Sequence, residues 1–141
     1  MKLQFSAGGI IYKKARSASS GQDEIFILVS QHSQHHGWVF PKGLIDEKEN
    51  KEQAALREVK EEVGVDGKII RALNPVTYWF VMEGEKIRKT VYYFIMEYAG
   101  GDIAKHDHEM EKVEWLPIEK VEERLTYKSD KIVWQEAKGL I

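Results

Sequence analysis

Three glutamates in the middle of the chain have the spacing at which helical side chains meet. Glu58, Glu61 and Glu62 stand at i, i+3 and i+4, and residues with these separations share one face of an α-helix. Carboxylates this close repel each other unless a cation lies between them. Mg²⁺ prefers carboxylate oxygens and keeps water in its remaining coordination positions. The spacing therefore indicates a divalent-metal site that also accepts a phosphate oxygen.

The same glutamates taken alone also fit an ordinary exposed helix, because surface helices are rich in Glu and Lys. The longer pattern around them decides between the two interpretations. Residues 43–65 read GLIDEKENKEQAALREVKEEVGV, which is a glycine, five residues, Glu49, seven residues, and then REVKEEVGV. This segment resembles the Nudix box at every position that the box specifies. Agreement at all of these positions is not expected by chance.

The resemblance implies an α/β fold, a Nudix-type α/β/α sandwich with a mixed β-sheet between helices. It also implies hydrolysis of a nucleoside diphosphate linked to a further group, by attack of water on phosphorus and without a covalent enzyme intermediate. The implied cofactor is Mg²⁺, for which Mn²⁺ can substitute. The metal ligands implied by the box are the backbone carbonyl of Gly43 and the carboxylates of Glu58, Glu61 and Glu62.

The resemblance also assigns catalytic roles, although it leaves one of them open. The general base is expected to be Glu58, with Glu61 and Glu109 as alternatives. Arg57 is expected to tie the helix to the loop before it, through Glu49. Lys48 stands where many family members have another glycine, which puts the shape of that turn in doubt but leaves the metal-binding face intact.

Segments outside the box resemble the dinucleoside polyphosphate hydrolase branch of the family. HHGWVFPKG, residues 35–43, contains the Trp and Pro-Lys-Gly that precede the box in that branch, and KTVYYF, residues 89–94, is similar to its substrate-binding strand. The implied reaction is asymmetric cleavage of diadenosine tetraphosphate to ATP and AMP. The substrate-binding residues implied by these segments are His36, Lys42, Lys89, Tyr93 and Tyr127.

Each of these residues has an expected role. Lys42 and Lys89 would meet phosphates, His36 would lie near the phosphate path, and an adenine would stack between the two tyrosines. Glu109 would supply an additional metal ligand from a loop. The competing interpretation of both tyrosines is core packing, and that of the lysines is an exposed loop or strand edge.

Other functions fit the same box. A damaged nucleoside triphosphate, ADP-ribose, a diphosphoinositol polyphosphate or the capped end of an RNA would be cleaved by the same chemistry. A non-catalytic nucleotide sensor is also compatible with the fold. The sensor has less need of three carboxylates that repel one another, so the intact glutamates favour an enzyme.

The helix that carries the glutamates is predicted to run from about Lys51 to Glu62. Asn50 can cap its beginning, and Gly64 can end it in a left-handed conformation. Its buried stripe is predicted from the apolar residues on the largely opposite side, which are Leu56, Val59 and Val63.

Runs of apolar and β-branched residues predict the strands around this helix. They lie at residues 2–12, 24–30, 68–82, 86–98 and 113–116. The two long runs are predicted to form a hairpin that turns at residues 83–85 and is interrupted at Pro75. Pro117 is expected to open a helix that extends to about Arg124, and Ser129 to cap a last helix that extends to about Lys138. Trp38 and Trp79 are predicted to belong to the core.

Composition limits the number of domains, the class of partner and the location of the protein. A chain of 141 residues with 43% hydrophobic residues has the length of a single domain, residues 1–141. The net charge of −2 argues against a general attraction to nucleic acid or membranes, so the expected partner is a small nucleotide. The chain has no cysteine and only a short apolar stretch near its N-terminus, from which we expect a cytoplasmic location. The sequence predicts no oligomeric state.

Overall fold

The computed structural model describes residues 1–141 and has a mixed β-sheet at its centre. Strands β1 (Lys2–Arg16) and β7 (Glu85–Gly101) run parallel to each other in the middle of this sheet. The main path of the sheet is β3-β2-β1-β7-β5, and β4, β6 and β8 pair with β1, β7 and β2. The other strands are β2 (Asp23–His32), β3 (Trp38–Val39), β4 (Lys42–Leu44), β5 (Val65–Ala72), β6 (Val76–Met82) and β8 (Met110–Pro117).

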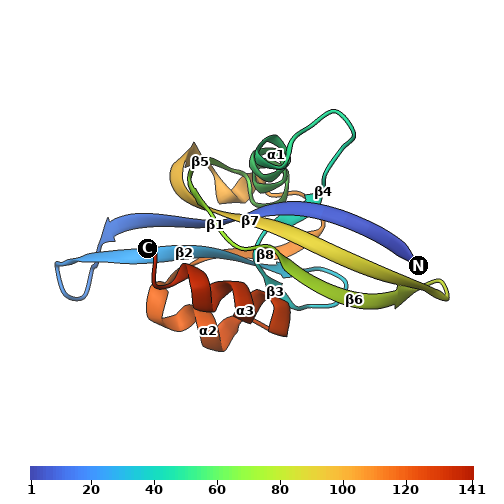
Figure 1. The fold of residues 1–141 in the computed structure, drawn as a ribbon. Helices are drawn as coiled ribbons and strands as arrows, with labels where there is room; N and C mark the ends of the chain where they lie inside the picture. The colour runs from blue at the N-terminus through green and yellow to red at the C-terminus, as the bar shows by residue number, and fades with distance from the viewer.

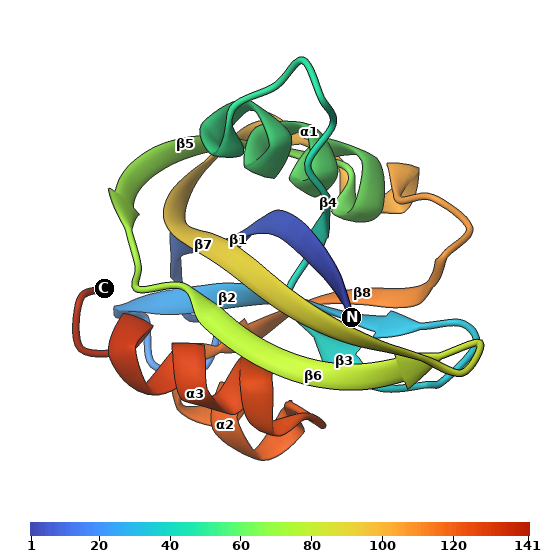
Figure 2. The same cartoon turned by 45° about the vertical axis from the view of Figure 1, so that its right-hand side comes forward.

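Helices cover both faces of the sheet. Helix α1 (Lys51–Val63) lies on one face, and α2 (Val121–Arg124) and α3 (Lys128–Ala137) lie on the other, as Figures 1 and 2 show. Two short 3₁₀ turns, η1 (Ile103–Lys105) and η2 (Ile118–Lys120), connect elements. The predicted α/β class, with a mixed sheet between helices, is confirmed.

Each face of the sheet has its own buried core. Successive side chains of a strand point to opposite faces, so Ile10 and Tyr93 pack with Trp134 on the α3 side. Their neighbours Ile11 and Phe94 belong to the cluster on the α1 side. This alternation decides which side chains of β1 and β7 meet α1 and which line the opposite face.

Helix α1 has both predicted caps. The Asn50 side chain accepts a hydrogen bond from the Gln53 amide at 2.8 Å, and the Gln53 side chain accepts one from the Asn50 amide at 3.0 Å, which together form a capping box. Gly64 ends the helix at φ 80°, as predicted, and the last helical residue is Val63, one residue after the predicted Glu62. The predicted buried stripe is partly wrong, because Leu56 is 37% exposed whereas Glu62 is buried.

The long hairpin differs from its prediction in one respect. The first predicted strand is two strands, β5 and β6, separated by residues 73–75, and both pair with β7. Pro75 thus interrupts the strand, as predicted. Glu83 and Gly84 have φ of 52° and 75°, which are the positive values of a type I′ turn. Trp79 is 49% exposed, so its prediction as a core residue is wrong.

The predicted cap of the last helix is wrong. Ser129 lies inside the first turn of α3, and the residue at the N-cap position is Tyr127, which makes no side-chain capping bond. Pro117 is the last residue of β8, and the helix predicted after it consists of η2 followed by α2. Trp38 is partly buried and packs against the α3-side cluster.

The helices are short. The longest, α1, has 13 residues, and none has the length and apolar character needed to span a membrane.

Replacing Asn50 by alanine should lower the free energy of unfolding by about 1 kcal/mol, because the amide of Gln53 loses its capping partner. Urea denaturation of the metal-free protein measures this change. Ser129→Ala is the matched control and should change stability by no more than about 0.5 kcal/mol, since Ser129 caps nothing. Equal losses in the two variants would contradict the capping assignment.

Candidate active site

Arg57 joins helix α1 to the loop that precedes it. Its Nε and Nη2 atoms donate to the two carboxylate oxygens of Glu49 at 2.9 and 2.7 Å, and Nη2 also donates to the Leu44 carbonyl at 3.1 Å. Nη1 donates to Glu58 at 2.7 Å and to Glu61 at 3.1 Å. The paired contact lowers the pKa of Glu49 to about 2. The guanidinium therefore fixes the loop and orients two of the three predicted glutamates.

Gly43 lies directly against the carboxylate of Glu58. Strand β4 pairs with β1 so that Gly43 stands opposite Ala7, on the α1 side of the sheet. A Cβ atom on Gly43 would overlap the Glu58 carboxyl group, so no other residue fits without moving Glu58. Burial raises the pKa of Glu58, although Arg57 acts in the opposite direction.

Glu62 is the most unusual carboxylate of the group. It is 5% exposed, and no protein group donates a hydrogen bond to it. Burial, together with the charges of Glu58, Asp107 and Glu109, raises its pKa to about 8, although Lys42 opposes this shift. A buried carboxylate without a donor, surrounded by further carboxylates, has the chemistry of a site for a hard divalent cation.

The carboxylates near Glu62 do not all face the same cavity. Glu62 and Glu109 line one cavity of about 210 Å³, whereas Glu58 and Glu61 are engaged by Arg57. No three of these groups meet at one point. The residues thus fit Mg²⁺ in donor type and charge, with Glu62 and Glu109 closest to the cavity. Asp107, which sequence analysis did not single out, adds a further carboxylate beside Glu62.

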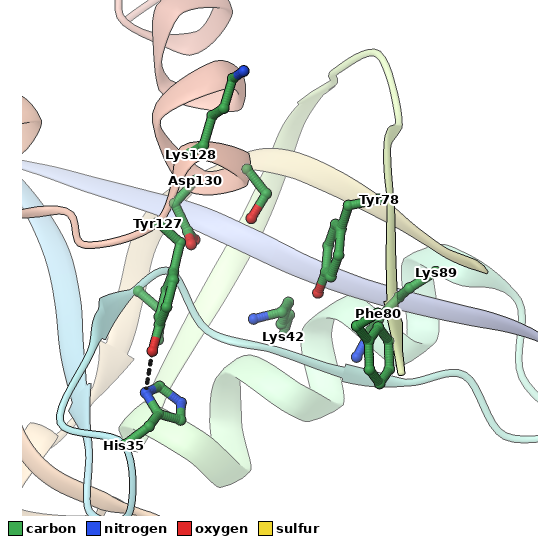
Figure 3. A pocket seen from close by; sticks show the side chains of 10 residues that line it. His35, Lys42, Tyr78, Phe80, Lys89, Tyr127, Lys128 and Asp130 are labelled. Atoms are coloured by element: carbon green, nitrogen blue, oxygen red, sulfur yellow. Dashed lines mark hydrogen bonds between the residues drawn. The ribbon is translucent and has the colours of Figure 1, made fainter. Parts of the chain in front are cut away.

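A larger cavity of about 550 Å³ lies on the α3 side of the sheet. In Figure 3, Tyr127 stands on one side of it and Tyr78 and Phe80 stand on the other, with Lys42 between them. It is lined by His35, Val39, Lys42, Tyr78, Phe80, Lys89, Tyr127, Lys128, Ser129 and Asp130. Four of these residues, His35, Val39, Lys42 and Lys89, also line the cavity at Glu62. The two cavities are therefore neighbouring parts of one cleft.

Three of the predicted substrate-binding residues line this cleft. Lys42 and Lys89 lie where its two parts meet, and Tyr127 forms a wall of the larger part. Burial, and then the charge of Lys42, lowers the pKa of Lys89 to about 8. Two ammonium groups at this junction form a positive region between the aromatic walls and the carboxylates.

The prediction that Tyr93 stacks on a base is wrong. Tyr93 is 3% exposed, belongs to the α3-side core, and contacts the Phe40 ring edge-to-face at a centroid distance of 6.3 Å. Neither face of its ring is open to a ligand. Tyr78 and Phe80 supply the aromatic wall instead. Tyr78 and Phe80 lie on one face of β6 and Trp79 on the other, but the sequence VTYWFVM is apolar from Tyr78 to Met82 and offers no signal for this difference.

The prediction for His36 needs a similar correction. His36 is at φ 59° and turns away from the cleft, where its Nδ1 lies 3.1 Å from a carboxylate oxygen of exposed Glu111. Its neighbour His35 lines both parts of the cleft. The turn between β2 and β3 decides which histidine points inward, and the sequence offers no periodic pattern there.

Known proteins are similar to this chain in both sequence and architecture. The family model described as NUDIX domain matches residues 6–135. The putative mutator protein MutT4 of Mycobacterium tuberculosis is 35% identical over 96% of this chain and 55% of its own length. The asymmetrical bis(5'-nucleosyl)-tetraphosphatase of Caenorhabditis elegans is 29% identical over 81% of this chain and 79% of its own.

A further relative and a solved structure are also similar to this chain. An 8-oxo-(d)GTP phosphatase of Mycolicibacterium smegmatis is 30% identical over 91% of this chain, which spans 39% of that protein. The chain thus covers about half or less of the two mycobacterial relatives. A crystal structure of a C. elegans Ap4A hydrolase binary complex superimposes with a TM-score of 0.70, over 97% of this chain and 96% of the other, at 23% identity. That likeness shows the shared fold.

The raised pKa of Glu62 predicts a pH-dependent stability in the absence of metal. Between the ordinary carboxyl pKa of 4.5 and about 8, the unfolded chain has lost the Glu62 proton while the folded chain retains it. The free energy of unfolding should therefore fall as pH rises through this window, by at most about 4–5 kcal/mol from this group. Glu62→Gln should abolish this contribution and be the more stable protein at pH 8.

Urea denaturation in the presence of a chelator, at pH 5, 6.5 and 8, measures this difference. Glu61→Gln is the matched control, because Glu61 is 55% exposed and its replacement removes a carboxylate of the same helix that is not buried. Parallel stability curves for the wild type and Glu62→Gln would show that the carboxylate of Glu62 is not held in an unfavourable environment.

Proposed function

The chain belongs to the NUDIX domain family, and we propose that it is a divalent-metal-dependent hydrolase of nucleoside polyphosphates. The observation that carries this proposal is the continuity of the aromatic-walled cavity with the cavity at Glu62, through Lys42 and Lys89. A base bound beside Tyr127 would direct its phosphates past the two lysines and toward the carboxylates. This arrangement suits a ligand with a flat apolar end and a long anionic end.

The proposed metal is Mg²⁺, or Mn²⁺ in its place, held by Glu62 together with Glu58, Glu61, Glu109 and the carbonyl of Gly43. When bound, it would neutralise phosphate charge and lower the pKa of the attacking water. Glu58 is the proposed general base. Its partial burial raises its pKa, which brings the carboxylate closer to the value that suits proton transfer near neutral pH. Glu61 and Glu109 are the alternatives.

The other residues of the cleft bind and orient. Lys42 and Lys89 donate to phosphate oxygens, and an anion beside Lys89 favours its charged form against the effect of burial. Arg57 keeps the Glu58 carboxylate in place through the 2.7 Å bond from Nη1. Tyr127, Tyr78 and Phe80 offer ring faces or edges to a base.

The substrate that we propose first is diadenosine tetraphosphate, cleaved asymmetrically to ATP and AMP. Two observations support it. The relatives from C. elegans, rat and pig carry the name of this activity and are 28–30% identical over 79–81% of this chain. The two lysines at the junction of the cavities also provide charge for a polyphosphate longer than a diphosphate.

A second candidate is an oxidised guanine nucleotide. The mycobacterial 8-oxo-(d)GTP phosphatase supports it, and so do Ser129 and Asp130, which add polar groups to the aromatic cavity. Such groups can hydrogen-bond the edge of a base, which stacking walls cannot distinguish. Both candidates share the same attack of water on phosphorus.

Hydrolysis in H₂¹⁸O with Mg²⁺ tests the proposal and separates the candidates. The substrates are diadenosine tetraphosphate, 8-oxo-dGTP and unmodified dGTP, ranked by kcat/KM, and the labelled product identifies the phosphorus attacked. We expect ATP and AMP from the dinucleotide and the highest kcat/KM for it. Failure to form ATP excludes the first candidate. If none of the three substrates is cleaved in a Mg²⁺-dependent way, the proposed function is contradicted.

Glu62→Gln should lower kcat by roughly a hundredfold or more, because the amide removes the most deeply buried negative charge of the metal site. Turnover at saturating substrate and Mg²⁺ measures the loss, and far-UV circular dichroism checks that the variant is folded. Glu47→Gln, in the exposed loop before α1, is the matched control and should keep the wild-type kcat. Unaltered turnover in Glu62→Gln would refute the metal assignment.

Tyr78→Ala should raise KM roughly tenfold, since one aromatic contact with a base contributes about 1–3 kcal/mol. Trp79→Ala is its matched control, because Trp79 is the next residue of β6 but lies on the opposite face of the sheet. Steady-state kinetics of both variants decide whether Tyr78 forms the wall. A larger KM change from Trp79→Ala than from Tyr78→Ala would contradict this placement of the base.

A further inference from the structure

Tyr127 is attached to the loop between β2 and β3 by one side-chain hydrogen bond. Its hydroxyl lies 2.7 Å from Nδ1 of His35, as the dashed line in Figure 3 shows. We propose that His35 is a positioning residue, which fixes the ring of Tyr127 as a wall of the large cavity before any ligand binds. This inference rests on the proposed function in one respect, namely that Tyr127 contacts the base.

The hydrogen bonds determine which nitrogen of His35 carries the proton. The backbone amide of Gly37 donates to the same Nδ1 at 3.0 Å. An amide N–H can only donate, so Nδ1 is unprotonated, and the hydroxyl of Tyr127 must also donate to it. The neutral ring then carries its proton on Nε2. A proton on Nδ1 would bring donors face to face and break both contacts.

The surroundings of His35 favour this neutral form. Burial, and then the neighbouring His32, Lys42 and His36, lower its pKa. The ring also stacks on His32 with a centroid distance of 4.2 Å and an interplanar angle of 9°. His35 is thus held by its own loop and does not depend on Tyr127 for its orientation.

The same loop constrains Tyr127 from a second direction. A Cβ atom on Gly37 would overlap the tyrosine ring, so the ring lies directly on the backbone of the loop. Next to it, the Trp38 amide donates to Oγ1 of Thr126 at 2.9 Å, and the Thr126 amide donates to the Trp38 carbonyl at 3.1 Å. The backbone of the tyrosine is therefore aligned, and His35 supplies the contact that selects its ring orientation.

This contact matters because the ring of Tyr127 is partly exposed and no other side-chain hydrogen bond holds its hydroxyl. The residue is 38% exposed, and an exposed ring loses rotamer freedom when a ligand orders it. A ring that is already ordered spares the ligand that loss, which is how pre-organisation increases affinity. The hydrogen bond should therefore affect substrate binding, and hence KM, much more than kcat.

Kinetics of four variants test the inference, with whichever proposed substrate the wild type hydrolyses. His35→Ala and Tyr127→Phe should each raise KM roughly three- to tenfold, the range expected from one hydrogen bond, with kcat nearly unchanged. The double variant should raise KM no more than either single variant does. His35→Asn should keep a KM near the wild-type value, because its amide oxygen can accept in place of Nδ1. A wild-type KM in His35→Ala, or additive effects in the double variant, would overturn the inference.

Nuclear magnetic resonance tests the contact without any substrate. In the ¹⁵N-labelled protein at pH 7.5, the ring of His35 should show the neutral form protonated at Nε2, and the Tyr127 ring should show an Overhauser contact with Gly37 that weakens in His35→Ala. An Nδ1-protonated ring, or an unchanged Overhauser contact, would overturn the inference. If no nucleotide is hydrolysed, the proposed function fails while these spectra still decide the role of His35.

Discussion

The guanidinium of Arg57 is the interaction on which the rest of the site depends. It lies within hydrogen-bond distance of Glu49, Glu58 and Glu61. Without it, Glu49 in the loop before α1 and the acidic face of α1 would repel each other. Its fixed planar donors suit this arrangement, because a lysine could not bind one carboxylate at two points and reach two others. Arg57 engages Glu58 and Glu61 but not Glu62, whose pKa burial raises to about 8. Glu62 is thus a buried carboxylate that receives no hydrogen bond from the protein itself.

Strand β4 connects the two faces of the sheet. It has only three residues, yet Lys42 and Gly43 stand opposite Gly8 and Ala7 of β1 and therefore project to opposite sides. Lys42 reaches the aromatic cavity, while Gly43 leaves room for the Glu58 carboxylate. A short strand at this position thus places an ammonium group in the aromatic cavity and leaves space beside a carboxylate on the other face. The aromatic cavity and the carboxylate face of α1 are in this way linked through two consecutive residues.

Features that depend on neighbours in the chain could be predicted from the sequence, and those that depend on distant pairing could not. The caps of α1 follow from residues next to its ends. The contact between Arg57 and Glu49, eight positions apart, was expected from the resemblance to the Nudix box. By contrast, Tyr93 and Tyr78 are both tyrosines in apolar strands, and only the register of β6 on β7 separates the core residue from the cavity wall. The same holds for His35 and His36, whose directions are set by a turn. The burial of Glu62 was missed because charge patterning alone predicts an exposed face.

The exposed indole of Trp79 has a practical consequence. The chain has four tryptophans, and they occupy different environments: Trp79 is 49% exposed with the Lys86 ammonium 4.6 Å above its ring, whereas Trp134 is 2% exposed in the core. Indoles in water emit at longer wavelength than buried ones and are reached by soluble quenchers. Intrinsic fluorescence can therefore distinguish loosening of the β6–β7 hairpin from loss of packing around α3, without any added label.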